Sequence, residues 1–102
     1  MKIQLNTDHH IQADESVVRH AEDSIGNALA RYAAQVTRVE VHLRDTNAGK
    51  GGTQDKHCTL EARLEGRPPA TASDEAGTIA AAITGAAKKL VRVLDSSLGK
   101  LG

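Results

Sequence analysis

The chain has 102 residues, enough for one small domain, and its 13 basic and 13 acidic side chains give a formal net charge of zero. Hydrophobic residues make up 39% of the sequence and charged residues 25%, which excludes wholesale disorder. The longest uncharged stretch, residues 76–87, is too short to span a membrane. No apolar block follows Met1, so a secretory signal is not expected. The single cysteine, Cys58, fits a reducing compartment. We therefore expect one cytoplasmic domain over residues 1–102, without a membrane partner.

The chain begins with an alternating segment. In residues 2–7, Ile3 and Leu5 point to one side and polar residues to the other, a pattern typical of a half-buried strand. Asp14 is a suitable helix N-cap, and apolar residues from Val17 to Tyr32 recur at helical spacing after it. The pattern predicts a first helix that starts after Asp14, closes at Tyr32 and has one apolar face.

The middle of the chain has the clearest strand patterns. Residues 36–44 alternate, with Val39, Val41 and Leu43 facing one way, and residues 56–65 alternate again with Cys58 and Leu60 facing inward. The glycine-rich stretch between them, residues 45–55, predicts a hairpin loop, and residues 66–69 predict a tight turn. Two antiparallel hairpins therefore share the strand over residues 56–65.

A weak strand and a helix complete the predicted elements. Ala70 and Ala72 alternate with polar residues, and two prolines before them indicate an edge strand. We expect Ser73 or Asp74 to cap the last helix. Its apolar stripe consists of Ile79, Ile83, Ala86, Leu90 and Leu94, with Ala87 and Leu98 on its flank.

The element order is β-α-β-β-β-α, which predicts an α+β fold of two layers. The crossover helix makes the first two strands parallel neighbours, and the remaining strands form a meander. Only one sheet face is apolar, so both helices must cover that face and leave the other in water. The wet face carries a set of acidic and basic side chains that we interpret as cross-strand charge pairs and not as catalytic groups: Glu40, Glu61 and Glu65, interleaved with Arg38, Arg44 and Arg63.

Charge is unevenly distributed along the chain. Residues 1–75 hold nine basic and twelve acidic side chains, whereas residues 76–102 hold four basic and one acidic. In the last helix Lys88, Lys89 and Arg92 are three and four residues apart and share the side opposite the apolar stripe. Such a cluster can neutralise phosphates, but it can also be an ordinary solvated face that complements the helix dipole.

No motif for catalysis, a metal or a cofactor stands out. Adjacent His9 and His10 point to opposite faces of an extended chain, and a possible approach of His42 to His57 would supply only two ligands. The glycine-rich stretch around Lys50 lacks the residues of a phosphate-binding loop and opens no helix. We therefore expect no enzyme activity, no metal site and no cofactor.

Several stretches of the sequence are similar to one known family. They are His10-Ile11-Gln12, residues 28–32, residues 36–43 and residues 89–94. In these stretches the chain resembles the short form of the ribosome hibernation-promoting factors and ribosome-associated inhibitors. The resemblance implies a fold similar to double-stranded RNA-binding domains. It also implies binding to the small ribosomal subunit near the decoding region, inhibition of translation and stabilisation of idle ribosomes under stress.

Under this resemblance, ribosomal RNA would be contacted through backbone phosphates, because the chain has only one aromatic residue on which a base could stack. Lys88, Lys89 and Arg92 would be the anchors. The secondary contacts would be Arg19, Arg31, Lys50 and Lys56. The neutral charge and the sparse basic residues of the first helix leave a second interpretation open. In it, the chain is a protein-interaction module of the same fold that has lost the ribosome and forms a homodimer through its sheet face or an edge strand.

Overall fold

The computed structural model describes residues 1–8, 11, 13–45 and 56–98. The predictions for Lys50, His9 and His10 concern residues that lie outside these ranges. The elements in chain order are β1 (Lys2–Thr7), α1 (Glu15–Ala28), the short 3₁₀ helix η1 (Ala30–Tyr32), β2 (Val36–Asp45), β3 (Lys56–Leu64), β4 (Arg67–Ala76) and α2 (Ile79–Ser97). This order confirms the predicted β-α-β-β-β-α succession.

The four strands form one mixed sheet in the order β1-β2-β3-β4. β1 pairs with β2 in parallel, Ile3 lying beside Val39, because α1 returns the chain to the same end of the sheet. β2–β3 and β3–β4 are antiparallel. The parallel pair, the meander and the edge position of β4 are therefore all as predicted.

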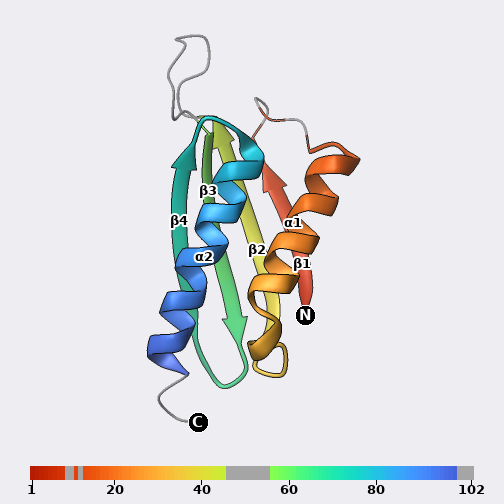
Figure 1. The fold of residues 1–102 in the computed structure, drawn as a ribbon. Helices are drawn as coiled ribbons and strands as arrows, with labels where there is room; N and C mark the ends of the chain where they lie inside the picture. The colour runs from red at the N-terminus through yellow and green to blue at the C-terminus, as the bar shows by residue number, and fades with distance from the viewer. Residues whose placement is uncertain (9–10, 12, 46–55, 99–102) are drawn as a thin grey trace.

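Both helices cover the same face of the sheet, and Figure 1 shows the two layers, with α2 over β3 and β4 and α1 toward β1. The core between the layers is aliphatic, as the composition predicted. Its largest fully buried side chains include Ile25, Leu29, Leu43, Leu60, Ile83, Leu90 and Leu94. At roughly 1.5–3 kcal/mol for each large aliphatic side chain, this burial is the main favourable term of folding.

One strand departs from simple alternation. Val36 and Val39 are both buried although they are three positions apart, an odd number that would put them on opposite faces. The register of β2 on β3 shifts between Val36 and Arg38, which indicates a β-bulge. The extra residue turns both valines toward the helices.

The predicted start of α2 is wrong. Ser73 and Asp74 do not cap this helix, because both continue the ladder of β4, opposite Thr59 and Cys58 of β3. The N-cap is Thr78, whose hydroxyl accepts a hydrogen bond from the backbone N–H of Ala81 at 3.1 Å. β4 is accordingly longer than predicted and already includes the two prolines assigned to the turn.

The start of α1 is as predicted, but its end is not. The Asp14 carboxylate accepts a hydrogen bond from the backbone N–H of Val17 at 3.0 Å, which lowers the pKa of this carboxyl. The α-helix ends at Ala28, before Tyr32, which lies in η1. The tighter 3₁₀ turn still leaves the Tyr32 ring in the core.

Two polar contacts fasten α1 and η1 to α2. The Nε2–H of His20 donates to the carbonyl oxygen of Ala80 at 3.1 Å, and the hydroxyl of Tyr32 donates to a carboxylate oxygen of Asp95. The second contact raises the pKa of Tyr32, because the hydrogen bond to Asp95 stabilises the protonated phenol. α2 is thus held near both of its ends.

No helix among the described residues is long and apolar enough to cross a membrane.

Candidate nucleic-acid interface

The outer face of α2 presents the three cations that the sequence singled out. The apolar stripe of α2 is buried, from Ile83 to Leu94, so residues on the opposite side face solvent. Lys88, Lys89 and Arg92 are all exposed. Within the part of the chain that the structure describes, Lys88 and Arg92 make no ion pair, so both charges are available to an anionic partner.

Lys89 differs from its two neighbours because a carboxylate already holds it. Its Nζ lies 2.9 Å from Oδ1 of Asp74, which comes from β4. The hydrogen bond from Lys89 lowers the pKa of the Asp74 carboxyl, so this group is ionised at neutral pH. The sequence predicted the exposure of Lys89 but not its partner.

The secondary cations on α1 and η1 are also paired with acids. Arg19 lies 3.8 Å from Glu15 in an i,i+4 pair, and both side chains are highly exposed. Arg31 lies 3.7 Å from Asp95 and over the Tyr32 ring, 5.4 Å from its centroid. Exposed pairs of this kind contribute about 0–1 kcal/mol, so a phosphate can exchange for the carboxylate at little cost.

Lys56 is far less accessible than the other described residues predicted to contact RNA. Its Nζ lies 3.4 Å from Oδ2 of Asp45, and its side chain is 24% exposed. It is level with Ala76 at the end of the sheet where α2 begins, whereas Arg31 lies beside Asp95 at the last turns of α2. The structure therefore gathers Lys88, Lys89 and Arg92 on one helix face but places Arg31 and Lys56 at opposite ends of α2.

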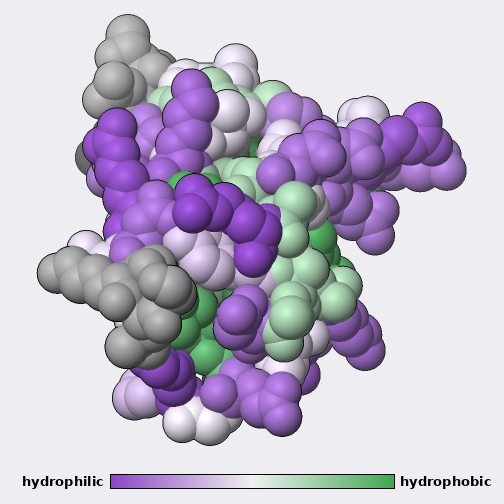
Figure 2. Space-filling view, turned by 60° about the horizontal axis from the view of Figure 1, so that its bottom comes forward, coloured by the Kyte–Doolittle hydropathy of each residue, from purple (hydrophilic) through white to green (hydrophobic). Residues whose placement is uncertain are grey.

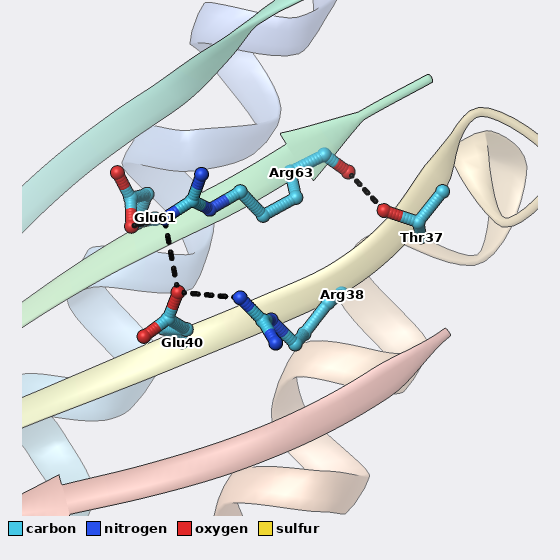
Figure 3. Close-up of polar contacts among 5 residues, drawn as sticks. All are labelled: Thr37, Arg38, Glu40, Glu61 and Arg63. Atoms are coloured by element: carbon cyan, nitrogen blue, oxygen red, sulfur yellow. Dashed lines mark hydrogen bonds and ion pairs between the residues drawn. The ribbon is translucent and has the colours of Figure 1, made fainter.

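The open face of the sheet carries the predicted cross-strand charge network, drawn in Figure 3. Glu40 of β2 lies directly opposite Glu61 of β3, an unfavourable pairing by itself. The Arg63 guanidinium lies 3.3 Å from Glu40 and 3.4 Å from Glu61, and Arg38 donates to the same Glu40 oxygen at 3.1 Å. The two arginines neutralise the glutamates, which confirms charge pairing on this face.

A possible set of metal ligands also lies on this face. The ligand atoms of Glu40, His42 and Glu61 all lie within 4.8 Å of one another. From the sequence, His42 could approach His57 across the hairpin. The register instead places Thr59 opposite His42 and Arg44 opposite His57. The guanidinium of Arg63 already occupies the space between the two carboxylates, so a cation would have to displace it.

Cys58 is a core residue, as its position on β3 predicted. Burial raises the pKa of its thiol to about 12, and the nearby Asp74 carboxylate adds to this effect. At neutral pH the thiolate fraction is therefore about a thousandfold smaller than for an ordinary thiol.

We expect iodoacetamide to modify native Cys58 at least a thousandfold more slowly than the urea-unfolded chain. Mass spectrometry of timed samples measures both rates. Comparable rates in the two states would contradict the burial of this side chain.

The same fold occurs in two solved structures. One is the N-terminal domain of Protein Y from Thermus thermophilus, with a TM-score of 0.75 at 18% identity over 95% of this chain and 99% of that chain. The other is a ribosomal subunit interface protein from Coxiella burnetii, with a TM-score of 0.66 at 14% identity over 99% of this chain and 97% of that chain. No curated protein sequence matches the chain.

The order of elements and the mixed sheet make the chain an α+β protein with the fold of these two structures. The model of one family, described as sigma 54 modulation protein / S30EA ribosomal protein, matches residues 5–101. The chain belongs to this family. Membership confirms the resemblance seen in the sequence and makes the chain a ribosome-associated protein of a family that is not an enzyme family.

Proposed function

We propose that this protein is a cytoplasmic, noncatalytic hibernation factor. In this role the chain, as one domain over residues 1–102, docks on the small ribosomal subunit near the decoding region. It would block the entry of messenger and transfer RNA sterically and so inhibit translation and stabilise idle ribosomes under stress. The family to which the chain belongs supports association with the ribosome.

The observation that carries the proposal is the outer face of α2. Lys88 and Arg92 are exposed without an ion pair among the described residues, and Lys89 lies between them. A rigid helix that presents three cations along one side can follow the phosphates of an RNA backbone. Arg19, Arg31, Lys50 and Lys56 remain proposed secondary contacts. Of the three that the structure describes, Lys56 is the least accessible.

Co-sedimentation with purified small subunits tests the proposal. We expect the protein to pellet with the subunits at low salt and to be released as salt rises, because phosphate contacts release condensed counterions. Purified large subunits serve as the control particle, since they also present abundant RNA. Absence from the small-subunit pellet even in dilute buffer would refute ribosome docking, and equal pelleting with large subunits would refute its specificity.

The ion pairs favour a second candidate, a self-associating interaction module. Of the six described cations proposed to contact RNA, four face a carboxylate within the chain, which reduces their attraction to phosphate.

At the end of the molecule where α2 ends, hydrophobic surface shows between hydrophilic side chains (Figure 2). A groove of about 400 Å³ is present there, lined by Leu64, Arg67, Pro68, Pro69, Ala70, Thr71, Val93 and Ser97. The exposed edge strand β4 borders this groove and is the natural place for a second copy to pair.

Sedimentation equilibrium of the pure protein separates the two candidates. A stable dimer that does not pellet with small subunits would support the interaction module and overturn the hibernation role. A monomer that pellets with the subunits would support the hibernation role alone.

A further inference from the structure

The Asp74 carboxylate lies in the space that a side chain at position 85 would occupy. Gly85 is in the interior of α2, and a Cβ added to it would come within 1.7 Å of the Asp74 Oδ2 atom and 2.8 Å of its Cγ. A non-glycine side chain at this position therefore cannot coexist with the present Asp74 conformation. The absence of a side chain at residue 85 allows β4 to place a carboxylate directly against the helix.

From this position the carboxylate reaches the basic face of α2. Gly85 and Lys89 are four residues apart and so lie on the same side of the helix. The second carboxylate oxygen of Asp74 accepts a hydrogen bond from the Lys89 ammonium at 2.9 Å. One short acidic side chain thus contacts the helix backbone at Gly85 and neutralises the lysine one turn further along.

The pair remains accessible to a partner. The Lys89 side chain is 53% exposed, and the two residues line a polar hollow of about 350 Å³ together with His57, Ser73 and Glu75. An anionic group can therefore approach the ammonium from solvent. Since an exposed pair is worth about 0–1 kcal/mol, the carboxylate competes with a phosphate without preventing its binding.

We propose that Asp74, admitted by Gly85, is an internal competitor for phosphate at Lys89 and thereby limits the affinity of this protein for RNA. The proposal rests on the proposed RNA-binding role of α2. In the free protein the outer face of α2 presents two available cations and a third that is masked. Docking exchanges the Asp74 carboxylate for an RNA phosphate at Lys89.

The Asp74→Asn variant tests this competition directly. We expect it to bind a short RNA duplex, and small subunits, about twofold to fivefold more tightly at low salt, which is the effect of one exposed ion pair. The slope of log affinity against log salt should stay close to the wild-type slope, because Lys89 contacts a phosphate in both complexes. The matched control is Glu75→Gln, which changes the net charge equally at the next residue but leaves the Lys89–Asp74 contact intact.

Gly85→Ala tests the geometry without a change in charge. The added Cβ forces the Asp74 carboxylate away from the helix, so we expect a smaller gain in RNA affinity in the same direction. Alanine favours a helix more than glycine does, so this variant is expected to fold, and circular dichroism verifies that it does. A folded Gly85→Ala variant with the RNA affinity of the wild type would overturn the assigned role of Gly85.

The double variant Asp74→Asn with Lys89→Ala isolates the pair. We expect Asp74→Asn to have no effect on RNA binding when Lys89 is absent, because nothing is then unmasked. An equal gain in this background, an equal gain in Glu75→Gln, or weaker binding by Asp74→Asn would each overturn the proposal.

Binding to the RNA duplex tests the competition at Lys89 separately from ribosome docking. If Asp74→Asn binds the duplex better than Glu75→Gln while no variant pellets with small subunits, the competition holds and ribosome docking fails.

Discussion

Replacing Lys88, Lys89 and Arg92 together by alanine is expected to remove most of the salt dependence of small-subunit binding. Three phosphate contacts predict a slope of about −2 to −3 for log affinity against log salt, so a fourfold rise in salt should weaken wild-type binding roughly 16- to 64-fold. In the triple variant this contribution is lost. We expect the residual binding to be weaker and its slope to be flatter, because only the secondary contacts remain.

Co-sedimentation at several salt concentrations measures the slope for each protein. A matched control replaces three exposed cations elsewhere, Lys2, Arg44 and Arg67, which lie on strands and not on α2. This control changes the net charge by the same amount, so it separates the location of the charges from their number. If the α2 variant retains the wild-type slope, or if the control loses as much, α2 is not the anchor.

The sheet was the most predictable part of this protein. In β2 and β3, apolar and polar side chains alternate because one face packs against helices and the other lies in water, and this pattern is visible in the sequence. The bulge at Val36 was not predictable from alternation, because it changes the phase of the pattern. Its position depends on how β2 pairs with β3.

Helix boundaries showed why local signals can mislead. Asp14 was correctly predicted as a cap because an amphipathic helix begins directly after it. Ser73 and Asp74 are equally good capping residues by type, but they belong to an edge strand, where polar residues also alternate. Tertiary pairing with β3 therefore overrode their local preference.

The candidate site was predictable in its positions but not in its partners. The spacing of Lys88, Lys89 and Arg92 placed them on the solvent side of α2, as the structure confirms. The pairing of Lys89 with Asp74 depends on the packing of α2 against β4 and on the missing side chain at Gly85. Such contacts between distant elements carry no periodic signal in the sequence.

Leu90→Ala is expected to destabilise the fold by about 2–5 kcal/mol. Leu90 is fully buried between α2 and the sheet, so truncation removes apolar contact and leaves a cavity. The total free energy of unfolding for a domain of this size is about 5–15 kcal/mol, so the variant loses a large part of it. The melting temperature should fall by about 10–30 °C, and thermal and urea unfolding followed by circular dichroism measure the loss.

Arg92→Ala is the matched control, because Arg92 is two residues further along the same helix and is exposed. We expect this variant to retain the wild-type free energy of unfolding within about 0.5 kcal/mol while its binding to small subunits weakens. The two variants thus separate the buried side of α2, which holds the fold together, from its basic side, which is proposed to contact RNA. A Leu90→Ala variant as stable as the wild type would show that α2 does not supply the core, and with it the rigid support that the proposed docking face requires.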